Sequence, residues 1–233
     1  MNWGYQKNKN FKIELINNNF ICIYKIMNIA INGFGRIGRL LTRSLQKEKN
    51  LNLVHINSGA NVETASYLLK YDSVHGKFLG NVNSITDIEI VPHSYLKFDD
   101  KLINYTQERD ITNLHWSNID LVVDCTGKYT DKMSAFKHIT SGSKKVLISA
   151  PGVNPHYTAV YGVNHNNLRD DDLIISSGSC TTNCLAPIAK ILDENLGIEK
   201  GFITTVHSYT GDQNLVDNSH KDLYRSRAAN CSI

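Results

Sequence analysis

From residue 27 onward, short runs of apolar residues alternate with segments of helical spacing. Apolar residues that recur every three or four positions predict a helix, and short β-branched runs between turn residues predict a buried strand. Strands are therefore predicted over residues 28–32, 51–56, 88–91, 102–105, 121–124, 146–149, 174–177 and 202–207. Helices are predicted over 36–47, 62–71, 131–140 and from about 180 onward. Strands alternating with helices indicate a mainly parallel, doubly wound α/β sheet.

The first 26 residues differ from the rest, because they are rich in Asn and Lys and show little periodicity. A secretory signal needs an unbroken apolar run, and the asparagines at 17–19 interrupt it. Met27 stands directly before a clean strand, so we expect translation to start there. Residues 1–26 are then a non-native or disordered extension, with a short targeting arm as the alternative. We expect a dinucleotide-binding domain over 27–178 and the first part of a catalytic domain over 179–233.

A GxGxxG motif formed by Gly33, Gly35 and Gly38 follows the first of these strands and opens the first helix. In that context the first glycine permits a tight turn, the second lets backbone N–H groups approach a pyrophosphate, and the third allows close helix–strand packing. The helix N-terminus adds partial positive charge for the anion. A plain strand–turn–helix corner is the alternative.

The end of the second strand bears on the choice of cofactor. NAD sites of this type place an acidic residue there, on the ribose hydroxyls. This chain has Ser58 at that position and no Asp or Glu before Glu63. Because no carboxylate repels an additional phosphate, both NAD and NADP remain open as cofactors.

A second candidate site lies around Cys180. Ser179 is a suitable N-cap for the helix that begins there, and a thiol at the positive end of a helix has a lowered pKa. His207 ends the predicted strand over 202–207, and it would form a thiolate–imidazolium pair with Cys180 if that strand lies beside the helix start. The alternatives are a structural thiol for Cys180 and a polar strand end for His207.

Composition excludes several function classes. The net charge of +3 is small and the basic residues are scattered, which argues against nucleic-acid binding. No stretch approaches the ~20 apolar residues that a membrane helix needs. Five cysteines in a chain of this length do not suggest a disulfide framework, and free thiols favour the cytoplasm. Cys180 and Cys184 lack a second close pair of Cys or His, so no metal site is expected.

Several motifs in order resemble those of phosphorylating glyceraldehyde-3-phosphate dehydrogenase. The resemblance extends over residues 27–233 without a large gap. The segments that carry it are SCTTNCLAP at 179–187, MNIAINGFGRIGRL at 27–40, YDSVHGKF at 71–78, ERD at 108–110, CTG at 125–127, KVLISAP at 145–151 and HSYTGDQ at 207–213.

The resemblance implies a role for each matching position. Cys180 is similar to the nucleophile that forms a thioester, and His207 to the base that activates it. The family's phosphate contacts correspond to Ser179, Thr181, Thr210 and Arg225, although Arg225 alone would suggest a solvated charge. Its cofactor contacts correspond to Gly33, Gly35, Arg36, Ile37, Gly38, Ser58, Arg109, Thr126 and Ser149. Glyceraldehyde 3-phosphate, inorganic phosphate and a homotetramer are the implied substrates and assembly, in glycolysis or gluconeogenesis.

Three departures from the family pattern stand out. Ser58 replaces the Asp of NAD-specific members, and residues 177–178 are Ser-Gly where Asn-Ala is usual. The chain also ends at Ile233, before the family's remaining third. We therefore expect the 202–207 strand to lack neighbours, and the chain alone to be poorly stable and weakly active.

Other readings of the same motifs are an inactive NAD(P)-binding fragment, a decaying coding sequence, and an erythrose-4-phosphate dehydrogenase. The erythrose enzyme ranks below glyceraldehyde-3-phosphate dehydrogenase. Its histidine motif differs after the His-Ser pair, whereas residues 209–212 here resemble those of the triose enzyme.

Overall fold

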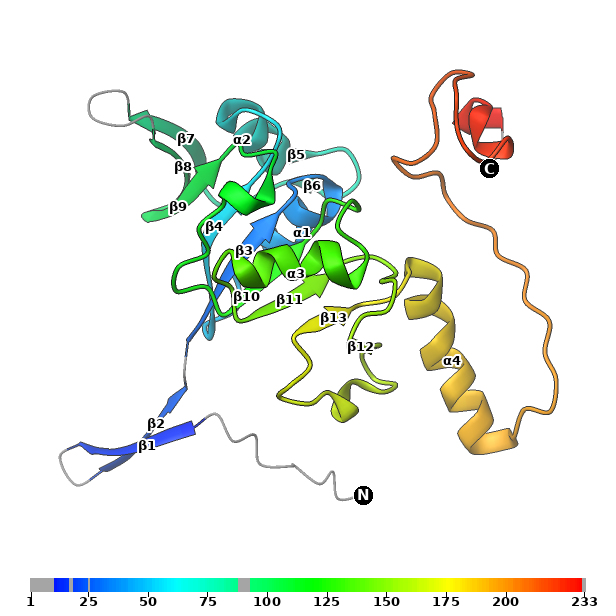
Figure 1. The fold of residues 1–233 in the computed structure, drawn as a ribbon, viewed down its shortest axis with the longest axis horizontal. Coiled ribbons are helices and arrows are strands. Elements are labelled where there is room, and N and C mark those ends of the chain that lie inside the picture. The colour runs from blue at the N-terminus through cyan, green and yellow to red at the C-terminus, as the bar shows by residue number, and fades with distance from the viewer. Residues whose placement is uncertain (1–10, 17–18, 25, 88–92, 232–233) are drawn as a thin grey trace. The chain divides into compact units, whose positions relative to one another are not determined.

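The computed structural model describes residues 11–16, 19–24, 26–87 and 93–231 (Figure 1). The chain divides into two compact units, Met1–Ala186 and Pro187–Ile233. Helix α4 (Cys180–Leu196) runs across that division. The domain ranges expected from the sequence, 1–26, 27–178 and 179–233, stay a prediction.

A nine-stranded sheet forms the centre of the first unit. Its order is β12 (Tyr157–Thr158), β13 (Ile174–Ser176), β11 (Lys145–Ile148), β10 (Leu121–Asp124), β3 (Met27–Asn32), β4 (Leu51–Asn57), β9 (Lys101–Thr106), β8 (His93–Phe98) and β7 (Val82–Asp87). Neighbours from β12 to β9 are parallel, and β8 and β7 add an antiparallel edge. The chain builds outward from β3 through β4 to β9, and then from β10 on the other side of β3. This is the doubly wound order of dinucleotide-binding sheets.

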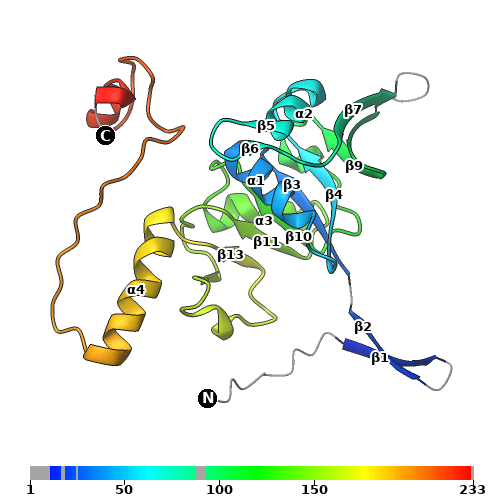
Figure 2. The same cartoon turned by 180° about the vertical axis from the view of Figure 1, so that it is seen from behind.

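Helices cover both faces of this sheet. They are α1 (Arg36–Leu45), α2 (Val62–Lys70) and α3 (Lys132–Thr140). Figure 1 shows α3 in front of the sheet, and the opposite view in Figure 2 shows α1 in front. Short elements complete the unit: β5 (Tyr71–Asp72), β6 (Gly76–Lys77), and the 3-10 turns Ile111–Asn113 and His165–Asn167.

Side-chain alternation along β3 explains the two faces. Ile29 and Ile31 are buried in one hydrophobic cluster with residues of α1 and α2, whereas Ala30 joins a second cluster with Trp116. Because successive side chains of a strand point to opposite faces, one apolar run serves both layers. Burial of one isoleucine side chain stabilises the folded state by roughly 2 kcal/mol relative to leaving it exposed.

Most predicted elements of the first unit are confirmed. The strands expected at 28–32, 51–56, 102–105, 121–124, 146–149 and 174–177 and the helices expected at 36–47, 62–71 and 131–140 are present, with ends shifted by no more than a few residues. Strands β7 and β8 and the two-residue strands β5, β6 and β12 were not predicted. Residues 88–91, predicted as a strand, lie outside the described residues.

The N-terminal extension contains a hairpin where no regular element was expected. Strands β1 (Phe11–Ile16) and β2 (Asn19–Tyr24) pair antiparallel, from Phe11 opposite Tyr24 to Ile16 opposite Asn19. Apolar and charged residues alternate over 11–15, whereas residues 20–24 are an unbroken run of apolar and aromatic residues. Both patterns are compatible with a strand.

The strand predicted over 202–207 is wrong, because the described second unit has no regular structure there. Phe202 and Val206 are 94% and 91% exposed. β-branched composition favours a strand only where a second strand accepts its hydrogen bonds, and no described strand pairs with this segment. The remaining elements of the unit are the 3-10 turns Tyr224–Ser226 and Ala229–Cys231. No helix in the described parts of the chain has the length and apolarity to cross a membrane.

Candidate functional site: a pocket at the sheet edge and the Cys180 helix

The glycine turn joins β3 to α1, and each glycine has its own structural reason. Gly33 has φ +95°, and a Cβ there would lie 2.7 Å from the backbone of Cys125 and Thr126. A Cβ on Gly38 would lie 2.2 Å from the carbonyl oxygen of Gly33. A Cβ on Gly35 would meet nothing within 4 Å. The first and third glycines are therefore required by the fold, whereas the second keeps the space before the helix open.

A pocket of about 320 Å³ lies beside this turn. It sits at the carboxyl ends of β3 and β10, where the strand order reverses, and this is the usual ligand site of doubly wound sheets. Its volume falls at the lower end of the range for small-molecule sites. The lining residues are Asn32, Gly33, Asn57, Ser58, Gly59, Glu108, Arg109, Ile111, Thr126, Lys128 and Tyr129.

Four of the cofactor positions expected from the sequence come together in this lining: Gly33, Ser58, Arg109 and Thr126. Ser58 is buried, and its hydroxyl accepts a hydrogen bond from the N–H of Ala60 at 3.2 Å. The side chains of Arg109 and Lys128 are exposed and offer positive charge at the same pocket. Glu108 is the acidic residue of the lining, and its carboxylate accepts the N–H of Asp110 at 2.8 Å.

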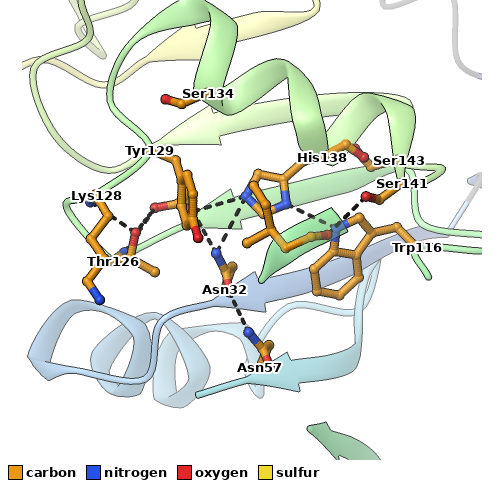
Figure 3. Close-up of polar contacts among 12 residues, drawn as sticks. Asn32, Asn57, Trp116, Thr126, Lys128, Tyr129, Ser134, His138, Ser141 and Ser143 are labelled. Carbon is orange, nitrogen blue, oxygen red and sulfur yellow. Dashed lines mark hydrogen bonds and ion pairs between the residues drawn. The ribbon is translucent and has the colours of Figure 1, made fainter. Parts of the chain in front are cut away.

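Two buried asparagines that the sequence did not single out form the floor of the pocket. The amide of Asn57 donates to the side-chain oxygen of Asn32 at 2.8 Å, and the amide of Asn32 donates to Asp124 at 2.8 Å (Figure 3). Both residues end an apolar strand at the same sheet edge. A polar residue that ends a buried strand is unusual, since burial of an amide requires partners. The place of each asparagine at the end of an apolar strand was therefore the sequence signal that could have identified the pair.

The other expected cofactor positions lie around the turn and do not line the pocket. Arg36 opens α1 and donates to Asp72 at 3.4 Å, while the backbone N–H groups of His75 and Val74 lower the pKa of Asp72 to about 2. Ile37 follows Arg36 and is exposed. Ser149, after β11, forms a side-chain hydrogen bond with Cys125.

Cys125 and Cys180 have opposite environments. Burial raises the pKa of the Cys125 thiol to about 11, so this thiol stays protonated at neutral pH. Cys180 is exposed and is the first residue of α4. The predicted N-cap is confirmed, because the N–H of Thr182 donates to the Ser179 hydroxyl at 2.9 Å.

The residues around this N-cap are held locally. The Ser179 hydroxyl also lies 3.1 Å from that of Thr181. Gly178 has φ +72°, a conformation that glycine adopts without strain.

The second unit holds the remaining candidates. The Nδ1 atom of His207 lies 2.7 Å from the carbonyl oxygen of Ser208, an acceptor only, so Nδ1 carries a proton. The N–H of Thr210 donates to Gln213 at 3.0 Å. Arg225 forms an ion pair with Asp212, and its hydrogen bond is the main cause that lowers the pKa of Asp212. Arg225 is therefore paired, although its side chain stays 48% exposed.

Comparison with known proteins decides the family. Residues 27–132 match the family description "Glyceraldehyde 3-phosphate dehydrogenase, NAD binding domain", and residues 179–233 match "Glyceraldehyde 3-phosphate dehydrogenase, C-terminal domain". Together these segments make up more than two thirds of the chain. The chain belongs to the glyceraldehyde-3-phosphate dehydrogenase family.

Individual relatives agree with this assignment. The chain is 46% identical over 209 residues to a glyceraldehyde-3-phosphate dehydrogenase of Cereibacter sphaeroides, and the match covers 89% of the chain. It is 45% identical to the enzyme of that name from Mycoplasma pneumoniae over 90% of the chain. It is 48% identical to the A, chloroplastic form of Chlamydomonas reinhardtii, again over 90%. The match spans 61% of the length of the first two relatives and 56% of the third.

Within this glyceraldehyde-3-phosphate dehydrogenase family, the sheet of the first unit is a Rossmann-type NAD-binding domain. The glycine turn and the pocket at the strand reversal lie inside the segment that matches it, and the Cys180 helix begins inside the segment that matches the C-terminal domain. In the part of the chain that the structure describes, no group of three His, Cys, Asp or Glu residues could hold a metal ion.

Proposed function

We propose that this chain carries the dinucleotide site and the reactive thiol of an enzyme that converts glyceraldehyde 3-phosphate and inorganic phosphate to 1,3-bisphosphoglycerate. The observation that carries the proposal is the exposed Cys180 at the capped first turn of α4, within the segment similar to the family's C-terminal domain. A cytoplasmic homotetramer that acts in glycolysis or gluconeogenesis is part of the same proposal and rests on the resemblance.

The residues around the glycine turn suit a dinucleotide. Gly35 leaves room for a pyrophosphate at the N-terminus of α1, where unpaired N–H groups favour an anion. Asn32, Ser58 and Thr126 would surround the adenosine part in the adjoining pocket. When bound, the nicotinamide ring supplies the acceptor for the hydride of the substrate.

The polarity of the pocket supports the use of NADP as well as NAD. Ser58 places a hydroxyl where a carboxylate would repel a 2′-phosphate, and Arg109 and Lys128 add positive charge to the same lining. Glu108 brings a negative charge to the same lining, opposed by the positive charges of Arg109 and Lys128.

Cys180 would perform the covalent chemistry. Its thiolate sulfur attacks the aldehyde carbon, and the carbonyl electron pair moves to oxygen to give a hemithioacetal. The backbone N–H of Cys180 would stabilise that oxyanion, a contribution typically worth ~3 kcal/mol. His207, assigned as base by the family resemblance, would take the proton of the Cys180 thiol, give it to the alkoxide oxygen, and take it back when the hydride leaves the same carbon for the bound cofactor. The carbonyl then re-forms, and a thioester remains on Cys180. A phosphate oxygen then attacks the thioester carbon, and the Cys180 sulfur leaves as thiolate.

Selective alkylation tests this assignment. We expect iodoacetate at pH 7 to label Cys180 at least tenfold faster than Cys184, which lies one helical turn further along α4. A His207→Asn variant should slow labelling of Cys180 about tenfold, because it removes the base that the family resemblance assigns to this thiol. Mass spectrometry of the labelled peptides measures both rates in one sample, so Cys184 serves as the internal control.

Two outcomes would contradict the proposal. Equal labelling of the two cysteines, unaffected by His207→Asn, would remove Cys180 as the activated nucleophile. If the chain binds NAD⁺ but the two cysteines are labelled equally, the chain is a dinucleotide-binding module and not an enzyme.

A further inference from the structure

A buried polar chain behind the pocket contains one residue that the proposed reaction does not use. His138 lies on α3, and its side chain is fully buried. The indole N–H of Trp116 donates to Nδ1 of His138 at 3.0 Å, and Nε2 lies 3.0 Å from a carboxylate oxygen of Asp124 (Figure 3). Because the indole can only donate, Nδ1 must be the acceptor. His138 is therefore neutral and carries its proton on Nε2, which donates to Asp124.

Asp124, at the end of β10, collects donors from three elements. One carboxylate oxygen accepts His138 Nε2–H and the amide of Asn32, at 3.0 and 2.8 Å. The other oxygen accepts the N–H and the hydroxyl of Thr126, at 3.0 and 2.6 Å. A single buried carboxylate thus joins β3, α3 and the turn after β10. Charged acceptors of this kind make the stronger hydrogen bonds of proteins.

Two of the groups held by Asp124 belong to the pocket wall. Asn32 and Thr126 both line the pocket, and the Thr126 hydroxyl in turn accepts the N–H of Lys128 at 3.1 Å. Tyr129, also in the lining, packs its ring edge-on against His138 at 5.8 Å between ring centres. The pocket wall therefore rests directly on the His138–Asp124 pair.

Packing alone does not require a histidine at this point. An apolar side chain of similar volume would fill the space without needing a donor for Asp124 and an acceptor for Trp116, and buried polar groups that lose a partner cost more than they contribute when paired. A fully paired polar chain is instead suited to define one arrangement of the groups it contacts.

We propose that His138 is a positioning residue of the dinucleotide pocket, which acts through Asp124 to hold Thr126 and Asn32 in the arrangement that accepts the ligand. Trp116 sets the tautomer in which His138 can donate. The inference rests on the dinucleotide site proposed above, and it adds residues of α3 and of the 114–119 segment to the support of that site.

Replacement of His138 by two different residues tests the proposal. His138→Gln keeps one donor and one acceptor at about the imidazole spacing, so NAD⁺ binding measured by calorimetry should stay within about threefold of the original chain. His138→Leu removes both groups, and we expect binding at least tenfold weaker. Ser143→Ala is the matched control, because it deletes a buried hydrogen bond of 3.0 Å to the backbone of His138 without touching Asp124. Its NAD⁺ affinity should be unchanged.

A second variant covers the case in which His138→Leu does not fold. Trp116→Phe keeps most of the ring volume but removes the N–H that sets the tautomer, and we expect NAD⁺ binding at least threefold weaker. In the original chain and in His138→Gln, the Trp116 indole N–H resonance should also shift when NAD⁺ is added.

The possible failures are distinguishable. If the original chain does not bind NAD⁺, the proposed site is wrong. If it binds, but His138→Gln weakens binding as much as His138→Leu, or Trp116→Phe binds like the original chain, the role of His138 is wrong. Weaker binding by Ser143→Ala equal to that of His138→Leu would also overturn it.

Discussion

The sheet of the first unit and the long segment after α4 contain the same kinds of apolar residues but bury them very differently. Leu53 and Ile56 on β4 are 0% exposed, whereas Phe202 is 94% exposed in the second unit. In the described part of the first unit, the buried apolar residues form three clusters to which its strands and helices contribute. Apolar character therefore gives a strand only where a second layer is available to bury it.

The largest expected difference within the first unit concerns its glycines. Gly38→Ala would place a Cβ 2.2 Å from a backbone oxygen, so helix α1 must move away from the turn. We expect the free energy of unfolding to fall by at least about 3 kcal/mol, at the upper end for overpacking. Urea denaturation monitored by tryptophan fluorescence measures the loss.

Gly35→Ala is the matched control for this substitution. Its Cβ meets nothing within 4 Å and its φ is −72°, so we expect a stability change of at most about 1 kcal/mol, from replacing a glycine at the helix N-cap. NAD⁺ binding should nevertheless weaken at least tenfold, because the methyl group occupies the space proposed for the pyrophosphate. Equal destabilisation by both substitutions would contradict the separate roles of the two glycines.

The same contrast explains what could be predicted from the sequence. The apolar strands and the GxGxxG turn were predictable, because their signals are local and agree with each other. The buried amides were not predicted, because Asn57 meets Asn32 across 25 positions and Asn32 meets Asp124 across 92. Such contacts depend on the order of strands in the sheet.

Other differences between prediction and structure arise because the local sequence pattern does not match the surroundings of the residue in the fold. Residues 202–207 have strand composition but no described partner strand. His138 looks like an ordinary polar position of an amphipathic helix, and only the fold shows that it is buried between Trp116 and Asp124.

A partly buried histidine on β4, His55, gives the next largest effect. Burial lowers the pKa of His55 from 6.5 to about 4, so the folded state resists a proton that the unfolded chain accepts. Stability is therefore unaffected above pH 6.5 and falls as the pH drops from 6.5 towards 4, by about 3 kcal/mol in total. Unfolding free energies measured at intervals between pH 7 and 4 should show this slope.

His55→Gln should remove most of that slope, because glutamine does not titrate and still has a group to bond the Thr106 hydroxyl, 3.0 Å from His55. His115→Gln is the control. This exposed histidine and His55 both line a second pocket of about 370 Å³, which is distinct from the pocket beside the glycine turn. A steep acid loss that persists in His55→Gln would show that other groups cause it.

The smallest expected effect comes from the second unit and tests the comparison most directly. Ile203 is 59% exposed, so Ile203→Ser removes little buried surface, and the free energy of unfolding should change by less than about 0.5 kcal/mol. Ile103→Ser in β9 makes the same chemical change at a residue that is 0% exposed, and it should cost at least about 3 kcal/mol. Hydrogen exchange of peptides spanning 202–207 should be complete at the earliest times in both proteins, because the segment has no strand hydrogen bonds to protect its amides. A large loss in the free energy of unfolding from Ile203→Ser, or slow exchange of those peptides, would mean that this segment is buried as a strand. The contrast between the two units would then reflect an unseen partner surface rather than the absence of a second layer.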